Sequence, residues 1–356
     1  MEQKSVLIGM SGGVDSSVAA ALLKEQGYHV IGATMRLWTY SDSCNMKHEG
    51  CCAESAVEDA RRVCDKLGID FYVMNFKDIF KDKVVDYFVD EYIHGRTPNP
   101  CIACNKYLKF DALLKKALAM GIDYVATGHY AKIEKGEDGK YILRASEAVK
   151  KDQSYVLYNF TQEQLAHTLM PLGGYNKDWV RQKAEELGLG VAHKPDSQEI
   201  CFVEDDDYAK FITDYSGYKP KEGDILDVNG NVIGKHRGLI YYTIGQRKGI
   251  GAYGRPMFVM KIDAENNTIT LGEKGMEFSN ELTAYDVNFV SGEFPKENML
   301  ITAKVRYQAP PAAAMLCPQK DGTVKLMFPE PQRAVTPGQA VVFYDGDIVL
   351  GGGTVL

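Results

Sequence analysis

Residues 5–17 read SVLIGMSGGVDSS, and the class of the fold follows from this stretch. Residues 5–10 form a short apolar run typical of a buried strand, and residues 16–26 have the pattern of a helix that ends at Gly27. The glycines between them allow a tight turn and a close approach of the backbone to an anion. Serine hydroxyls, backbone N–H groups and the helix dipole all favour a phosphate here. The stretch therefore predicts a strand, a phosphate-binding loop and a helix.

Strands and helices continue to alternate through the first third of the chain. Further strands are expected at residues 30–36, 71–76 and 123–127, and helices at residues 54–67, 78–93 and 108–120. This spacing predicts βαβ units, and hence an α/β domain with a doubly wound parallel sheet.

The pattern changes after about residue 130. Residues 131–144 indicate a hairpin, and two helices are expected near residues 161–170 and 177–187. From Gly223 onward, short β-rich runs alternate with turn signals such as Asn229-Gly230, which predicts one or two small β-barrels. We expect three regions: residues 1–155 with the parallel sheet and the hairpin, residues 156–222 with helical or mixed structure, and residues 223–356 with a β-rich fold ending in a β-barrel.

The composition bounds the class of protein. The chain has 356 residues, 45% hydrophobic and 25% charged, which excludes a disordered protein and predicts two or three domains. The N-terminus does not resemble a secretory signal, and no apolar run is long enough for a membrane span. We therefore expect a cytoplasmic protein with no membrane partner, whose eight cysteines are thiols, metal ligands or redox groups.

The charge is unevenly distributed. The net charge of −7 taken alone argues against a nucleic-acid partner. Residues 235–261, however, contain six basic residues, no acidic residue and several interleaved aromatic residues. Such a stretch suits phosphate contact and base stacking. The alternative is a solvated hairpin surface.

The phosphate-binding loop is not a Walker A loop, because the lysine of that motif is absent. The pattern SGGxDS resembles the PP-loop of N-type ATP pyrophosphatases, which cleave ATP between the α- and β-phosphates. The alternative is a Gly/Ser turn in which Asp15 caps the helix.

Two cysteine-bearing segments lie further along the chain. Residues 95–105 read GRTPNPCIACN, and residues 196–202 read DSQEICF. A thiol at the start of a helix has a lowered pKa, and Lys106 and Lys109 would lower it further. A CxxC alone could be a redox pair, half of a zinc site or a coincidence, and Cys201 alone would more often be a core thiol.

The order of the motifs is more specific than any one of them. The loop and the two cysteine segments occur together with ATGHY at residues 126–130, KDQSY at 151–155, IGQRKG at 244–249 and TPGQ at 336–339. Over its whole length the chain resembles the tRNA-specific 2-thiouridylases. This resemblance implies an adenine nucleotide α-hydrolase-like domain, a central domain and a C-terminal β-barrel. It also implies ATP- and Mg²⁺-dependent 2-thiolation of the wobble uridine, U34, in tRNA.

The resemblance implies a role for each matching residue. The ATP contacts of the family fall on Gly9, Met10, Ser11, Gly12, Gly13, Val14, Asp15, Ser16, Ser17, Met35 and Gly128. The target-base positions fall on Asn99, Pro100 and Cys101. The tRNA-contact positions fall on His129, Lys151, Asp152, Gln153, Arg306, Tyr307 and Gln339. The catalytic positions fall on Asp15, on Cys104 as nucleophile and on Cys201 as the persulfide carrier.

Cys101 departs from the family pattern, because many members carry Asp there. Three thiols could then converge, which leaves two sulfur routes open. Cys201 could receive a persulfide from a cysteine desulfurase or a sulfur relay, after which Cys104 would release sulfide or form a disulfide bond. Alternatively, Cys101, Cys104 and Cys201 could hold a [4Fe–4S] cluster with one open iron.

Three further expectations complete the interpretation. By family resemblance the tRNA partners are the Lys, Glu and Gln isoacceptors. The residues Cys44, His48, Cys51 and Cys52 are either metal ligands or part of an ordinary loop. The competing functions are another PP-loop enzyme, such as a tRNA lysidine synthetase or an amide-forming synthetase, and an RNA-binding protein with a structural zinc.

Overall fold

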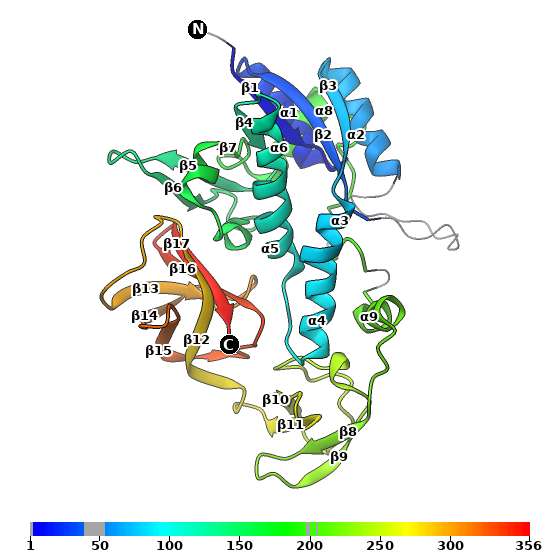
Figure 1. Cartoon of the computed structure of the whole chain (residues 1–356), viewed down its shortest axis with the longest axis vertical. Helices are drawn as coiled ribbons and strands as arrows, with labels where there is room; N and C mark the ends of the chain where they lie inside the picture. The colour runs from blue at the N-terminus through cyan, green and yellow to red at the C-terminus, as the bar shows by residue number, and fades with distance from the viewer. Residues whose placement is uncertain (1–2, 39–53, 197–199, 204–205) are drawn as a thin grey trace.

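The computed structural model describes residues 3–38, 54–196, 200–203 and 206–356 (Figure 1). The candidate metal ligands Cys44, His48, Cys51 and Cys52 lie outside these residues. None of the helices in the described ranges is long and apolar enough to cross a membrane.

The N-terminal part contains a five-stranded parallel sheet, in the order β3-β2-β1-β4-β7. Its strands are β1 (Ser5–Gly9), β2 (His29–Arg36), β3 (Asp70–Asn75), β4 (Tyr124–Ala126) and β7 (Thr168–Leu169). The predicted α/β class with a parallel sheet is confirmed. The strand order reverses at β1, which pairs with β2 on one side and β4 on the other.

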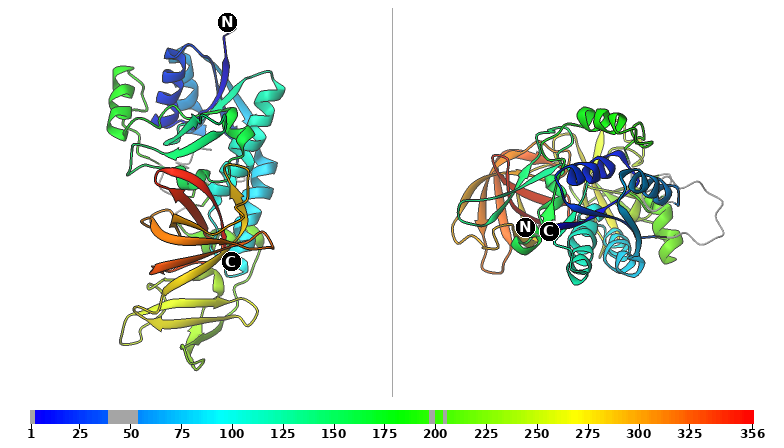
Figure 2. Two further views of the ribbon diagram at one scale, coloured as in Figure 1. Left: turned by 90° about the vertical axis from the view of Figure 1, so that its left-hand side faces the viewer. Right: turned by 90° about the horizontal axis from the view of Figure 1, so that it is seen from above.

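Helices cover both faces of this sheet. Successive side chains of β1 therefore point alternately into two cores, one on each face of the sheet. Val6 and Ile8 pack with α1 (Val14–Glu25), α2 (Glu54–Leu67) and α8 (Lys177–Glu186). Leu7 points to the other face, where it packs in the core formed by residues 76–122. This alternation is the two-residue period of a strand buried on both sides. The view from above in Figure 2 shows the sheet between its helices.

Two long helices cover the second face. The first comprises α3 (Lys77–Phe80), a π-helical stretch (Lys81–Asp86) and α4 (Tyr87–Ile93). The second comprises α5 (Pro100–Cys104), a π-helical stretch (Asn105–Ala112) and α6 (Leu113–Ala119).

The second long helix begins eight residues before the predicted start at residue 108. Its cap explains the difference: Asn99 Oδ1 accepts hydrogen bonds from the amides of Cys101 (3.1 Å) and Ile102 (3.4 Å), and Pro100 occupies the first helical position. The CxxC therefore lies inside the first turns of a helix.

The expected hairpin is present as β5 (Ala131–Lys135) and β6 (Tyr141–Ala145). It leaves the parallel sheet and joins the C-terminal barrel, where Arg144 pairs with Ile348. Helix α7 (Gln162–Ala166) is shorter than predicted, because the following residues enter the parallel sheet as β7. Helix α9 (Tyr208–Ser216) follows, capped by Asp207.

The rest of the chain is β-rich, as predicted. A four-stranded sheet contains β8 (Gly223–Leu226), β9 (Val232–His236), β10 (Met257–Asp263) and β11 (Thr268–Glu273). Six strands then form a barrel: β12 (Phe278–Phe289), β13 (Met299–Lys304), β14 (Ala312–Pro318), β15 (Val324–Arg333), β16 (Ala340–Asp345) and β17 (Ile348–Val355). Pairing of β12 with β17 closes it. Short 3₁₀ helices lie at Ser154–Leu157 and Leu239–Tyr241.

Candidate active site

The loop between β1 and α1 is held in shape by its own serines. The Ser11 amide donates to Ser16 Oγ (3.2 Å), and the hydroxyls of Ser16 and Ser17 donate to the Gly13 carbonyl (3.2 and 2.8 Å). Gly12 has a φ of +71°, and a Cβ there would lie 2.3 Å from the Ala56 carbonyl oxygen. Both serine side chains are therefore used to shape the loop, and Gly12 cannot be replaced without moving α2.

Gly128 and Met35 lie beside this loop at the carboxyl edge of the sheet. Gly128 follows β4 and packs so closely on the start of α1 that a Cβ would lie 2.7 Å from Ser16 N. Met35 lies two residues beyond Ala33, which pairs with Gly9 across β1 and β2. Ligands of open α/β sheets bind outside the carboxyl ends of the strands, where the strand order reverses. The fold therefore brings the three predicted nucleotide segments to one place.

The Asp15 carboxylate forms an ion pair that the sequence did not predict. Lys177 Nζ lies 2.8 Å from each of the two Asp15 carboxylate oxygens, and the Tyr130 hydroxyl donates to Asp15 Oδ1 (2.7 Å). Burial, followed by the Asp15 carboxylate, raises the pKa of Tyr130. Lys177 belongs to no motif, so only the packing of α8 against α1 reveals it.

A second carboxylate joins the same cluster. Asp196 forms ion pairs with Lys151 (2.7 Å), Lys177 (2.7 Å) and Arg181 (3.3 Å). Burial alone would raise the pKa of Asp196, but hydrogen bonds from Lys151 and Lys177 hold it below its usual value. Asp196 lies five residues before Cys201, so these ion pairs connect the Cys201 segment to the phosphate-binding loop.

The thiols differ in exposure. On α5, Cys101 is exposed, whereas Cys104 is 8% exposed and packs in the core of the second sheet face. Cys201 is exposed, and the neighbouring Phe202 is buried. The alternative that Cys201 is a core thiol is therefore wrong: Phe202 occupies the core position and Cys201 does not.

The three thiols do not form a ligand set in the structure. Within the described ranges, no group of three or more Cys, His, Asp or Glu side chains is arranged to hold a metal ion. As placed, Cys101, Cys104 and Cys201 do not fit a [4Fe–4S] cluster. The same ranges contain no disulfide bond, so the expected disulfide between Cys104 and Cys201 is not supported.

The segment before α5 is held by both β-rich regions. The Thr97 amide donates to the Pro337 carbonyl (2.9 Å), and Gln339 Nε2 donates to the Thr97 carbonyl (2.8 Å). Thr97 Oγ1 also lies 3.2 Å from Thr243 Oγ1. The TPGQ motif and Thr243, which directly precedes the IGQRKG motif, therefore position the residues that lead to the CxxC, and Gln339 serves here as a clamp.

The residues of the KDQ segment point into the protein. Asp152 accepts hydrogen bonds from the Ser146 amide (3.0 Å) and Ser154 Oγ (2.8 Å). Gln153 Oε1 accepts from the Tyr130 amide (2.9 Å), and Lys151 pairs with Asp196. Each side chain thus fixes the loop in this structure.

His129 is buried. Its Nδ1 lies 2.7 Å from Thr127 Oγ1, and 9% of the residue is exposed. Burial, with a smaller effect of Lys109, holds the pKa of His129 well below its usual value.

Tyr307 joins the barrel to the segment at residues 151–155. Its hydroxyl donates to the Asp152 carbonyl (3.1 Å), and its ring lies against Tyr155 at 5.7 Å. Burial is the largest cause that raises the pKa of Tyr307, and charges on Asp152 and Cys101 also act on it. Tyr307 is 39% exposed, and the preceding Arg306 is half-buried. The structure therefore packs Tyr307 against the segment at residues 151–155.

Part of the positive charge of the basic stretch at residues 235–261 is neutralised by ion pairs. Three of its members pair with acids outside the stretch: Lys235 with Asp224 (2.6 Å), Arg255 with Glu273 (2.7 Å) and Lys261 with Asp263 (3.0 Å). The exposed side chains Arg237, Arg247 and Lys248 remain available for phosphate contact.

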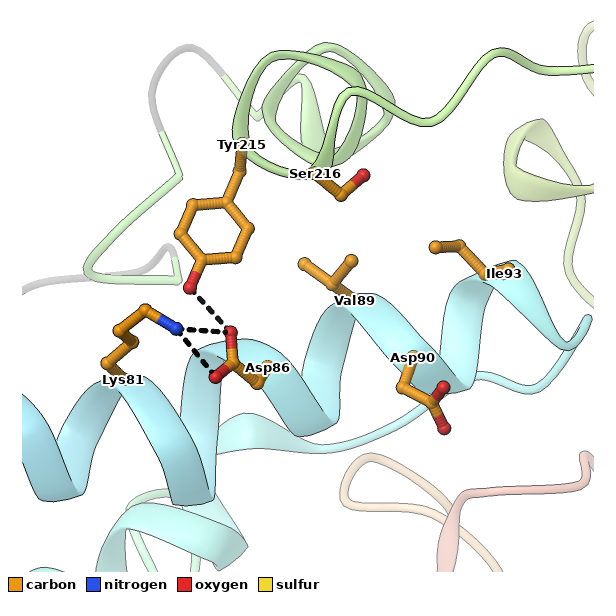
Figure 3. A pocket seen from close by; sticks show the side chains of 7 residues that line it. All are labelled: Lys81, Asp86, Val89, Asp90, Ile93, Tyr215 and Ser216. Atoms are coloured by element: carbon orange, nitrogen blue, oxygen red, sulfur yellow. Dashed lines mark hydrogen bonds and ion pairs between the residues drawn. The ribbon is translucent and has the colours of Figure 1, made fainter.

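An open pocket between α9 and the first long helix contains none of the predicted site residues (Figure 3). Lys81 Nζ and the Tyr215 hydroxyl both bond to Asp86 there. Lys81 and Asp86 therefore satisfy one another, Asp90 pairs with His94, and the candidate site lies elsewhere, at the carboxyl edge of the sheet.

Comparisons with known proteins agree along the whole chain. Residues 4–205 match the tRNA methyl transferase HUP domain, residues 209–273 the tRNA methyl transferase PRC-barrel domain and residues 279–355 the aminomethyltransferase beta-barrel domain. The chain is 59% identical to the tRNA-specific 2-thiouridylase MnmA of Acetivibrio thermocellus, over 100% of both chains. It is 58% identical to the corresponding protein of Clostridioides difficile, over 99% of this chain and 98% of that one. For Clostridium botulinum strain Alaska E43 the identity is 57%, over 100% and 98%. This chain therefore belongs to the family of tRNA-specific 2-thiouridylases.

Proposed function

We propose that this enzyme uses ATP to replace the 2-oxygen of the wobble uridine, U34, in tRNA by sulfur, with release of AMP and pyrophosphate. Besides family membership, one observation supports the proposal most directly. The segment that carries Cys201 is tied through Asp196 and Lys177 to Asp15 in the phosphate-binding loop. A nucleotide site and a thiol-bearing segment are thus coupled in one cluster, as a reaction that needs both requires.

The first step activates a poor electrophile. The uracil 2-oxygen attacks the α-phosphorus of ATP, a new O–P bond forms, and the bond to the β-phosphate breaks as pyrophosphate leaves. The loop from Gly9 to Ser17, with Met35 and Gly128 beside it, would bind the nucleotide. Amides at the start of α1 favour the phosphates.

Asp15 fits a role as ligand of Mg²⁺. Magnesium in nucleotide sites is held by one or two carboxylates together with substrate phosphates, and Asp15 is the carboxylate of the loop; both of its oxygens contact Lys177, which would have to yield one of them to the ion. When bound, the ion would neutralise charge on the departing pyrophosphate.

Sulfur transfer would use the two family cysteines. A donor protein, such as a cysteine desulfurase or a sulfur relay, places a sulfane sulfur on Cys201. The Cys104 thiolate attacks Sγ of this persulfide and frees hydrosulfide, which adds to C2 of the activated base as AMP leaves. A dithiol reductant then supplies two electrons and returns Cys104 and Cys201 to thiols. An iron–sulfur cluster takes no part in these steps, because the three thiols as placed do not form its ligand set.

We propose that the β-rich regions bind the tRNA and the sheet domain performs the chemistry. In this division, residues 1–155 form the catalytic domain, residues 156–222 a tRNA-binding region with Cys201, and residues 223–356 a further tRNA-binding region. The exposed Arg237, Arg247 and Lys248 are suited to phosphates.

The wobble base must leave its stack to be modified. We propose that it enters beside Asn99, Pro100 and Cys101, with Tyr307 available for stacking. The tRNA contacts would also involve His129, Lys151, Asp152, Gln153, Arg306 and Gln339. The substrates would be the Lys, Glu and Gln isoacceptors, modified in the cytoplasm.

The decisive test is thiolation of tRNA by the full-length chain with ATP and a persulfide donor, followed by retardation of thiolated tRNA in a mercury-containing gel. Cys104→Ser and Cys201→Ser should each abolish thiolation, whereas Cys317→Ser, in a barrel strand, should not. If both site variants thiolate tRNA as well as the wild type, the proposal fails. Lysine-dependent or amide-forming turnover of ATP would instead identify another PP-loop chemistry.

The sulfur route has its own test. The wild type and Cys101→Asp are purified anaerobically and analysed for iron and sulfide. We expect iron-free protein that is fully active with the persulfide donor in both cases. Activity that requires about four iron atoms per chain, and is lost in Cys101→Asp, would replace the persulfide route by the cluster route.

A further inference from the structure

The phosphate-binding loop lacks a cation of its own. Loops of the Walker A type contain a lysine that reaches the β- and γ-phosphates, and residues 9–17 contain neither lysine nor arginine. Transfer reactions of ATP nevertheless depend on Lys, Arg or metal ions to neutralise the charge on the departing phosphates. Besides a metal ion, side-chain positive charge can therefore reach this loop only from another element of the fold.

Lys177 is a cation in direct contact with the loop. It is the first residue of α8, and its Nζ lies 2.8 Å from both carboxylate oxygens of Asp15, the second residue of α1. Its side chain is only 12% exposed. Val180 and Ala184 of α8 pack in the core beside α1, which fixes the start of α8 against the loop.

Lys194 reaches the loop from the other side of the same cluster. Its Nζ lies 3.2 Å from the Gly12 carbonyl oxygen and 3.0 Å from Asp59 Oδ2. Arg181 holds this segment, because its Nη1 donates to the carbonyls of Ala192 (2.9 Å) and Lys194 (3.3 Å).

The cluster carries more positive than negative charge. Its cations are Lys151, Lys177, Arg181 and Lys194, and its carboxylates are Asp15, Asp59 and Asp196. A buried cation needs an anionic partner, and here two carboxylates share Lys177. Because of its excess positive charge, the cluster can bind a further anion at the loop while all four cations stay in place.

We infer that Lys177 binds the β- and γ-phosphates of ATP and supplies the charge that the loop motif omits, with Lys194 as its neighbour. Asp15 and Asp196 hold Lys177 in place before the nucleotide arrives, and phosphate oxygens then become its partners. This inference rests on the proposed use of ATP by the loop. It assigns to α8 a binding role that no motif of the sequence indicates.

The test compares nucleotides with and without these phosphates. Dissociation constants of MgATP and of AMP are measured by titration calorimetry on the full-length wild type, Lys177→Met, Lys177→Arg and a control, Lys183→Met. Lys183 lies on the same helix but pairs with Glu25, away from the loop. Hydrogen bonds to charged groups are worth about 1.5–3 kcal/mol. Lys177→Met should therefore weaken MgATP binding by roughly 10- to 100-fold and change AMP binding less than about threefold.

Three further results decide the inference. Lys177→Arg should recover part of the MgATP affinity, and Lys183→Met should match the wild type. Equal weakening of MgATP and AMP by Lys177→Met would show that Lys177 only ties the cluster together, and unchanged MgATP affinity would likewise overturn the inference. Absence of ATP binding in the wild type would instead refute the proposed function.

A second variant keeps the question answerable if Lys177→Met does not fold. Asp196→Asn removes one carboxylate partner of Lys177 and leaves the lysine in place. If Lys177 binds phosphates, MgATP binds Asp196→Asn as tightly as the wild type or more tightly. If Lys177 serves only to tie Asp196 to Asp15, MgATP binding falls in this variant, and the inference is refuted.

Discussion

Replacement of Gly128 by alanine adds one methyl group where the end of β4 meets the start of α1. The new Cβ would lie 2.7 Å from Ser16 N and 2.8 Å from the carbonyl carbon of Asp15. Both atoms belong to the backbone, so no side chain can rotate to make room. Since non-bonded carbon contacts are most favourable at about 3.5–4.0 Å, the two segments must separate by roughly 1 Å.

Two effects of Gly128→Ala can be estimated separately. Overpacking of this kind costs about 1–3 kcal/mol of folding free energy, and each kcal/mol lowers the melting temperature of a domain of this size by roughly 2–4 °C. A displacement of about 1 Å at a reacting group can reduce the rate by on the order of 100-fold. Loss of ATP-dependent thiolation should therefore exceed what the modest loss of stability explains.

The assay measures MgATP affinity, tRNA thiolation and thermal unfolding of the same preparations. Gly190→Ala is the matched control, because a Cβ at Gly190 meets no atom within 4 Å. It should match the wild type in all three measurements. If Gly128→Ala binds MgATP and thiolates tRNA as well as Gly190→Ala does, the nucleotide does not depend on the contact between Gly128 and the loop, and the site has been placed wrongly.

Three other predictions concern the clamp, the core and the edge of the sheet. Gln339→Ala removes the donor to the Thr97 carbonyl, a bond worth about 0.5–1.5 kcal/mol; the thiolation rate at saturating tRNA should fall severalfold, in addition to any loss of tRNA affinity from the proposed contact of Gln339 with tRNA, and a loss confined to tRNA affinity would contradict the clamp. Burial, and then a neighbouring carboxylate, raises the pKa of Cys64 to about 12, so only about one thiol in 10⁴ is ionised at pH 8. Mass spectrometry should find Cys64 unalkylated in the folded protein and alkylated after unfolding; rapid labelling of the folded protein would exclude this burial. A hydrogen bond from Lys4 is the largest cause that lowers the pKa of Asp123 from 3.8 to about 2. Asp123 therefore stabilises the fold above about pH 4, and this contribution is lost as the pH falls toward 2. Asp123→Asn should be less stable than the wild type at pH 6, and the difference should shrink as the pH falls through about 2; a difference as large at pH 2 as at pH 6 would contradict the assignment.

The nucleotide loop and the sheet around it follow from local sequence. An apolar strand, a glycine-rich turn and a helix are each encoded by neighbouring residues, and the alternation of such units leads to a parallel sheet. One interpretation failed although the local signal was present. The start of the second long helix was missed at Asn99 and Pro100, a pair that is a helix-start signal.

Cysteine chemistry was predictable only in part. The motifs identified Cys101, Cys104 and Cys201, but no sequence pattern shows how deeply a thiol is buried. In the structure, Phe202 takes the core position and leaves Cys201 exposed, whereas Cys104 is nearly covered. Exposure depends on which of two adjacent residues meets a distant helix, and that is a tertiary property.

The basic stretch shows the same limit for charge. Its 27 residues contain six cations and no acid, yet three of the cations pair with carboxylates outside the stretch: Asp224 on β8, Glu273 on β11 and Asp263 at the end of β10. A count along the chain ignores partners that a sheet places at the next strand. The positively charged surface of this stretch is therefore smaller than its sequence suggested.

By itself, the sequence determined the order of the secondary-structure elements, the phosphate-binding loop and the family, because each depends on residues close together in the chain or on the order of motifs. Only the tertiary structure decided what surrounds the loop. Lys177 reaches Asp15 across 162 residues, and Thr97 is held by residues of both β-rich regions. Such contacts arise from the packing of helices and sheets against one another, and no local pattern records them.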